Sequence, residues 1–325
     1  AMGINVTAVY VGLASGPFLG GLLTRYLGWR SIFAFLVPMG IISLFLIRSR
    51  MKREWAEAKG ESFDWAGSVI YGVSMAALMY GFSKLPSLHG WLITGTGLVL
   101  MPIFVIREKK AVHPLFDITL ISKNRVFAFS SLAALIHYAA TSAIGFFLSL
   151  FLQYIKGLGP RDAGFVLMSW PLTMALISPA AGKLSDSKNP GVLASIGMAI
   201  TSVGLIILCF LTDQTSIVLI ITVLVIMGAG FSLFSSPNSN AIMSSVEKRQ
   251  LGNASGMLGT MRNVGQTFSM AIALMLLALY MGQEKINPGN YAQLMSSMKS
   301  GFVVFSVLCF AGIFASLARN KSLRK

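Results

Sequence analysis

The stretch Gly12-Leu-Ala-Ser-Gly16-Pro17-Phe-Leu-Gly20-Gly21 lies in an apolar run near the start of this chain. Gly12, Gly16 and Gly20 recur every four residues, so on a helix they share one face and leave it flat. In lipid, a flat face lets a second helix approach to backbone distance. Pro17 removes one backbone donor within that face and should bend or loosen the helix there. The stretch therefore predicts a helix seam inside a membrane, serving either static packing or the boundary between two moving bundles.

Composition places the chain in a lipid bilayer. Its 325 residues are 55% hydrophobic and only 11% charged, whereas soluble domains have about 25% charged residues. The mean hydropathy is +0.73. A net charge of +15 would indicate nucleic-acid binding in a soluble protein, but basic residues also accumulate in the cytoplasmic loops of membrane proteins. No basic-aromatic patch is present, so we expect an all-α polytopic membrane protein with no nucleic-acid partner.

About ten transmembrane helices are expected, because crossing a bilayer takes roughly 20 apolar residues. The expected spans are 2–24, 31–48, 64–84, 91–106, 126–151, 163–182, 191–211, 216–237, 254–281 and 300–318.

Loop charges predict the orientation. With the N-terminus inside, the cytoplasmic segments hold 18 Lys and Arg, the opposite segments hold seven, and Arg262 lies within a span. This excess predicts a multi-pass protein of the cell (cytoplasmic) membrane with both ends of this chain in the cytoplasm.

Two basic loops divide the spans into groups of two, two and six. Residues 1–48 hold two helices, residues 49–125 hold a cytoplasmic loop and two central helices, and residues 126–325 hold a six-helix bundle. Six helices are a familiar half-transporter and two are not. We therefore expect the two N-terminal helices to be the last of another bundle, with four helices upstream of Ala1.

Several motifs resemble the major facilitator superfamily, in particular its fourteen-helix drug/proton antiporter family. Residues 12–21 resemble the antiporter motif of helix five, and Gly182-Lys-Leu-Ser-Asp186 resembles the loop motif between the second and third helices of a half. The other matching segments follow in family order along the chain: 29–33, 38–40, 63–67, 114–117, 123–127 and 252–266.

The resemblance implies the major facilitator fold lacking its first four helices, in an N-terminally truncated fragment that begins at helix five. It implies a secondary active multidrug-type efflux transporter that exchanges protons for small, amphipathic or cationic compounds by alternating access. It also implies an acid in helix one and a basic residue in helix four, so the fragment alone is expected to be inactive. The alternatives are a metabolite transporter of the same fold, or a non-transporting fragment or sensor.

Ionisable residues within the spans are few. All eleven acidic residues fall in loops or near span ends, although a proton-coupled exporter needs an intramembrane ionisable group, usually a carboxylate. His137 lies midway through a span and is either a proton relay or a neutral packing histidine. Arg262, beside Asn263 and Gln266, either faces a cavity or a carboxylate, or extends its guanidinium to the headgroups.

Other candidate sites are weaker. Asp186 would form a gating contact, or would complement the positive N-terminal end of the next helix. The 22 Phe and 18 Met residues are suited to an adaptable apolar cavity. Cys209 and Cys309 lie in apolar spans, the three His are scattered and HExxH is absent, so we expect no metal, no cofactor and no enzyme.

Overall fold

The computed structural model describes residues 12, 16, 19–24, 26–50, 64–111, 114, 118–247, 250–282 and 284–319. Within these residues every regular element is a helix, and nine helices are long and apolar enough to cross a membrane. The prediction of an all-α polytopic membrane protein is therefore confirmed. The expected first span is described only at Gly12, Gly16 and 19–24, and Pro17 lies outside the described residues.

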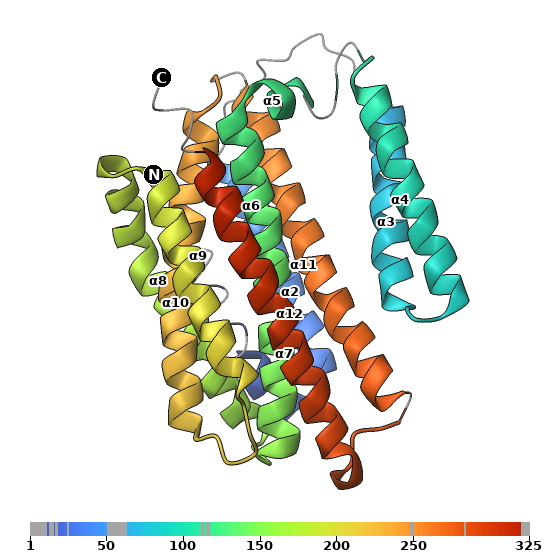
Figure 1. Ribbon diagram of the computed structural model, residues 1–325, viewed down its shortest axis with the longest axis vertical. Coiled ribbons are helices and arrows are strands. Elements are labelled where there is room, and N and C mark those ends of the chain that lie inside the picture. Colours follow the sequence, from blue (N-terminus) through green and yellow to red (C-terminus); the bar gives the residue numbers. More distant parts are fainter. Residues whose placement is uncertain are drawn as a thin grey trace.

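Figure 1 shows the helices coloured in chain order. Their bounds are α2 Arg30–Arg50, α3 Trp65–Ser83, α4 Leu88–Glu108, α5 Ile118–Lys123, α6 Arg125–Thr141, α7 Ile144–Leu150, a π-helical turn η1 Phe151–Ile155, α8 Pro160–Ser187, α9 Pro190–Cys209, α10 Ile217–Ser244, α11 Leu251–Met281, a 3-10 turn η3 Pro288–Asn290 and α12 Tyr291–Ala318.

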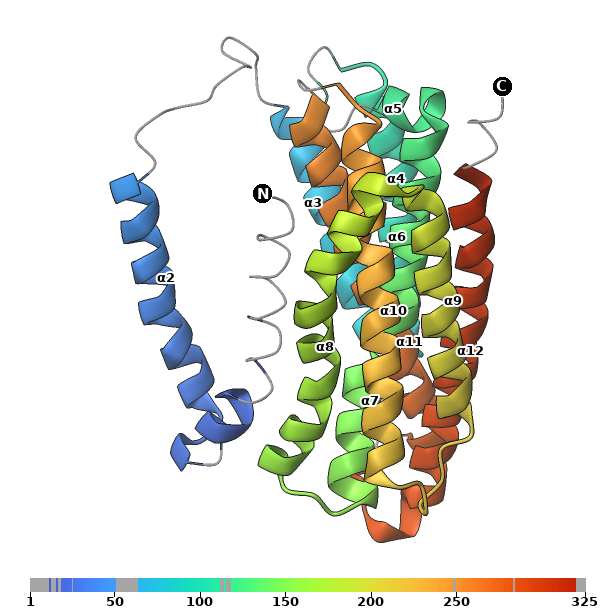
Figure 2. The ribbon, with the colours of Figure 1, turned by 90° about the vertical axis from the view of Figure 1, so that its left-hand side faces the viewer.

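Helices α6 to α12 form a bundle with an apolar core, in which Phe147 packs against Phe302 and Phe305 at ring-centroid distances of 5.7 and 6.2 Å. Helices α9 and α10 meet at backbone distance, because a Cβ on Gly197 would lie 2.5 Å from the carbonyl oxygen of Gly230. Helix α2 lies apart from the bundle in Figure 2, and none of its residues is buried.

The first span of the bundle is interrupted between α6 and α7. The backbone N–H of Ala143 has left the helical pattern and donates instead to Ser269 Oγ on α11, at 2.9 Å. An unsatisfied backbone group at membrane depth costs several kcal/mol, about the energy that this bond recovers. Ser269 therefore allows the span to bend inside the bundle.

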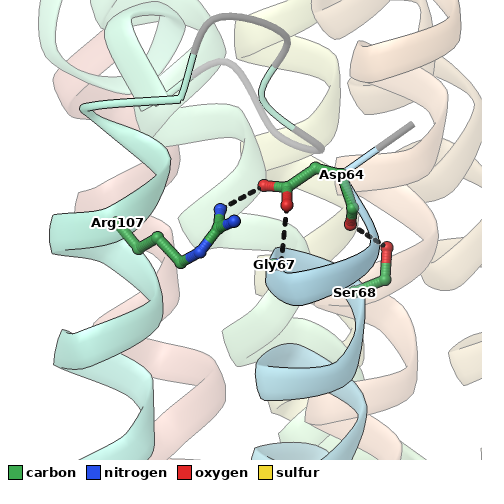
Figure 3. A network of polar contacts seen from close by, with 4 residues as sticks. All are labelled: Asp64, Gly67, Ser68 and Arg107. Atoms are coloured by element: carbon green, nitrogen blue, oxygen red, sulfur yellow. Dashed lines mark hydrogen bonds and ion pairs between the residues drawn. The ribbon is translucent and has the colours of Figure 1, made fainter. Parts of the chain in front are cut away.

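Helices α3 and α4 form a hairpin clamped where α3 begins and α4 ends (Figure 3). The Asp64 carboxylate accepts from the backbone N–H of Gly67 at 2.8 Å and pairs with Arg107 at 2.5 Å. The Gly67 N–H, followed by the Arg107 guanidinium, lowers the pKa of Asp64 although burial opposes them. The carboxylate therefore stays ionised at neutral pH and keeps both contacts.

The span bounds expected from hydropathy are too short in several places. Helix α8 begins at Pro160 rather than 163 and continues through Pro171 and Pro179 to Ser187, and α12 begins at Tyr291 rather than 300. Hydropathy marks the stretch that lies in hydrocarbon, whereas caps and neighbouring helices decide where a helix ends.

Candidate functional site

An aromatic group with one cation lies where α6, α8, α10 and α11 meet. Tyr138 and Trp170 both contact the Phe231 ring edge-to-face, at centroid distances of 5.4 and 6.2 Å. The Arg262 guanidinium carbon lies 5.6 Å from the centre of the Tyr138 ring, a cation–π distance. We call Tyr138, Trp170, Phe231 and Arg262 the polar–aromatic cluster.

Glycines on two helices bring these side chains together. A Cβ on Gly228 of α10 would lie 2.7 Å from the carbonyl oxygen of Trp170, so only glycine lets α8 approach there. A Cβ on Gly265 of α11 would lie 2.5 Å from the carbonyl oxygen of Leu135 on α6. The polar–aromatic cluster is therefore fixed by two backbone contacts, one on each side of it.

Arg262 turns its side chain toward α6 and α10. Its Nη2 donates to Ser239 Oγ at 3.0 Å, and no carboxylate among the described residues pairs with it. A positive charge at this depth therefore lies over the Tyr138 ring with only neutral contacts from the part of the chain that the structure describes. Such a charge marks a binding or coupling position more often than a packing position.

Asn263 and Gln266 point elsewhere. They line a cavity of about 570 Å³ between α3 and α11, whereas Arg262, one residue before Asn263, lies in the polar–aromatic cluster. The structure therefore places Arg262 in a different environment from Asn263 and Gln266, its neighbours in the sequence.

His137 lies inside the bundle core, next to the polar–aromatic cluster. Its side chain is 0% exposed and its ring packs 4.1 Å from Phe234 and 5.0 Å from Phe231. Nδ1 lies 3.8 Å from Cys309 Sγ, and no described residue hydrogen-bonds Nε2. These surroundings are apolar and contain no acid, so they fit a neutral packing histidine better than a relay.

We therefore expect His137→Gln to leave any substrate-dependent proton flux unchanged. The assay is dissipation of an imposed pH gradient in everted vesicles that contain the protein. The matched control is His89→Gln, an exposed position on α4. If the His137 variant still binds substrate but no longer moves protons, while the His89 variant does both, the relay interpretation is correct.

The glycine face of residues 12–21 meets the bundle at its end. A Cβ on Gly21 would lie 3.3 Å from the carbonyl oxygen of Pro160, where α8 begins. A Cβ at Gly12, Gly16 or Gly20 would have no described atom within 4 Å apart from its own helix. Gly21, the last glycine of the motif, is therefore the one for which the structure describes a close contact with α8.

Comparison with known proteins identifies the architecture. The sequence profile of the Major Facilitator Superfamily matches residues 1–270. The chain belongs to the major facilitator superfamily. It is 29% identical over 322 residues to the riboflavin transporter RibZ of Clostridioides difficile (strain 630), a match that covers 98% of this chain and 69% of RibZ.

Two further matches are informative. The multidrug resistance protein Stp of Mycobacterium tuberculosis (strain CDC 1551 / Oshkosh) is 28% identical over 287 residues, covering 86% of this facilitator chain and 53% of Stp. A crystal structure of a mutant of the nucleoside transporter NupG has a TM-score of 0.53 at 12% identity and covers 97% of this chain and 83% of that chain. At that identity it supports the fold alone.

The loop motif of this major facilitator chain joins α8 to α10. The Asp186 carboxylate accepts from Asn240 Nδ2 at 3.3 Å, and the same amide donates to Ser185 Oγ at 3.1 Å. Gly182 faces Ser236, whose Oγ would lie 3.2 Å from a Cβ there. The cap of α9 is Asn189, which accepts from Gly191 N–H at 2.8 Å.

A buried arginine at the end of this facilitator bundle was not singled out from the sequence. Arg319 is 2% exposed and donates to Asn238 Oδ1 at 2.7 Å, to Ser130 Oγ and Ser316 Oγ at 2.9 Å, and to the Gly191 carbonyl at 3.1 Å. These partners belong to α6, α9, α10 and α12. Burial lowers the pKa of Arg319 to about 10, so it remains charged at neutral pH.

No local sequence signal would have found this contact, because three of its partners lie 81 to 189 positions away. Among the described residues of the facilitator chain, no three His, Cys, Asp or Glu side chains lie together as metal ligands would.

Proposed function

We propose that this chain is part of a secondary active multidrug-type efflux transporter, which exports small molecules in exchange for protons by alternating access. The polar–aromatic cluster carries the proposal. It combines a charge and stacking surfaces from four helices, as a binding site for aromatic compounds requires. The name of the similar protein Stp, a multidrug resistance protein, supports export.

We further propose that the chain corresponds to helices five to fourteen of a fourteen-helix antiporter, with residues 1–48, 49–125 and 126–325 as its three parts and both ends in the cytoplasm. The match to 69% of RibZ and 53% of Stp is consistent with this assignment. The glycine face of residues 12–21 would form the seam with α8, and the coupling acid would lie in another helix. Asp186 would hold α8 to α10 during the rocking motion.

The positive charge of Arg262 restricts which substrates could bind beside it. We propose amphipathic or cationic compounds as cargo, but a cation would bind beside Arg262 only if a carboxylate from another helix offset its charge. The guanidinium itself favours a neutral or anionic aromatic compound. This contact, together with the similarity to a riboflavin transporter, supports a second candidate function, the transport of a flat aromatic metabolite.

Transport assays on the complete reading frame test both functions. In everted vesicles with an imposed pH gradient, ethidium serves as the cationic aromatic probe and riboflavin as the uncharged one. If the protein is a multidrug antiporter, ethidium dissipates the gradient; if it is a metabolite antiporter, riboflavin alone does so. A gradient that neither probe dissipates contradicts antiport of these compounds.

Arg262→Gln separates the two substrate proposals. Losing a partly desolvated cation–π or charged hydrogen-bond contact of about 1–2 kcal/mol should weaken riboflavin transport about five- to thirtyfold while ethidium transport is kept or improved. Arg125→Gln, at an exposed position on α6, is the matched control. Equal loss for both probes would show that Arg262 supports the fold or the coupling rather than substrate choice.

A further inference from the structure

A cavity of about 570 Å³ separates α3 from α11, and we propose that it binds an uncharged amphipathic molecule from the membrane phase. The proposal is independent of the transported substrate, because the polar–aromatic cluster faces α6, α8 and α10 instead. Cavities of about 300–1,000 Å³ are the usual size of small-molecule sites.

The cavity is bounded by two contacts between parallel helices. On one side Tyr71 Oη donates to Thr260 Oγ1 at 3.1 Å, and on the other the Phe82 and Phe268 rings lie 4.8 Å apart. Between these contacts α3 presents Met75 and other residues on one face to α11. The two helices thus meet in two places and stay apart between them.

The opposite face of α3 is packed closely. Ser74 Oγ donates to the Gly97 carbonyl of α4 at 2.9 Å, and a Cβ on Gly97 would lie 2.9 Å from the backbone nitrogen of Leu78. The Asp64–Arg107 pair closes one end of this hairpin (Figure 3). Small residues allow α3 and α4 to pack closely, whereas flexible methionines line the side of α3 that faces α11. The cavity therefore lies only on that side of α3.

The lining defines the chemistry of the ligand. None of the residues lining the cavity is charged, so an ion would enter without a counter-charge. Asn263 and Gln266 present side-chain amides to it, and neither amide hydrogen-bonds another residue within the described part of the chain. At membrane depth an amide needs a partner, so the ligand has an apolar body that fits the methionines and a neutral hydrogen-bonding group.

Fluorescence titration tests the site. The whole chain in phosphatidylcholine nanodiscs is titrated with N-phenyl-1-naphthylamine, an uncharged aromatic amine, and with 1-anilinonaphthalene-8-sulfonate, which has a similar skeleton and a negative charge. Empty nanodiscs give the background. We expect saturable binding of the amine and none of the sulfonate above background.

Three variants locate the binding. Gln266→Leu should weaken amine binding about five- to tenfold, the effect of one hydrogen bond, and Met75→Trp should abolish it by filling the cavity. Gln293→Leu, at an exposed position on α12, should change nothing. Amine binding that survives both cavity variants in folded protein, or sulfonate binding of equal strength, would overturn the proposal.

Native mass spectrometry distinguishes a bilayer lipid from an added compound as the source. A neutral lipid that is retained by the purified wild-type chain and lost from Met75→Trp identifies the lipid. Retention of no lipid, together with saturable amine binding, identifies an added compound.

Discussion

Replacing Arg319 with methionine is expected to lower the free energy of unfolding by about 3 kcal/mol or more, because several buried acceptors would lose a charged donor. The guanidinium makes four hydrogen bonds to α6, α9, α10 and α12. Methionine has similar length and would fill part of the space without donating. The Asn238 amide oxygen would then be left buried and unsatisfied, whereas the Gly191 carbonyl would keep the hydrogen bond that Ser195 Oγ donates to it at 2.8 Å.

Thermal unfolding of the detergent-solubilised chain, followed by tryptophan fluorescence, measures this loss. Arg319→Lys should be intermediate, since an ammonium group cannot reach acceptors on four helices in the fork geometry of a guanidinium. Arg125→Met, at an exposed position on α6, is the matched control. An Arg319→Met midpoint equal to that of the control would show that these hydrogen bonds contribute no net stability.

Gly197→Leu is expected to destabilise the bundle at least as strongly, by more than about 3 kcal/mol, because the new side chain would collide with backbone rather than with movable side chains. A Cβ at Gly197 would lie 2.5 Å from both the Gly230 carbonyl oxygen and the Phe234 nitrogen on α10. The two helices would have to separate, which would also loosen Phe231, the α10 member of the polar–aromatic cluster.

A matched pair of alanine variants keeps this prediction testable if Gly197→Leu does not fold. Gly197→Ala should lower the unfolding midpoint. Gly259→Ala should raise the midpoint, because a Cβ at position 259 has no neighbour within 4 Å and alanine's higher helix propensity adds up to about 1 kcal/mol to the free energy of unfolding. If both substitutions raise the midpoint, the close approach of α9 and α10 does not limit stability.

The fold was predictable because hydrocarbon imposes a strong local rule. A chain must form helices of about 20 apolar residues to cross the bilayer, so length and hydropathy revealed the spans without any knowledge of their partners. The helix ends were less predictable. Helix α12 begins at Tyr291, directly after the 3-10 turn η3, which the Asn287–Asn290 capping box stabilises upstream of the apolar stretch.

Only the charged member of the candidate site was predictable. Arg262, like His137, stood out because ionisable side chains are rare at membrane depth. The aromatic members of the cluster did not stand out, since Tyr138, Trp170 and Phe231 come from three different helices in a chain with many aromatic residues. Arg319 was also missed, because three of its hydrogen-bond partners lie on other helices, far away in the sequence.

The membrane class, the approximate number of helices and the motifs of the major facilitator superfamily follow from the sequence, because they depend on local composition and spacing. That Arg262 faces the Tyr138 ring while Asn263 and Gln266 face a cavity beside α3 depends on the tertiary structure. Successive residues on a helix point in directions about 100° apart, so neighbours in sequence can contact different helices. Hydropathy shows that a residue lies within the bilayer, but its partner depends on which helix packs against that face.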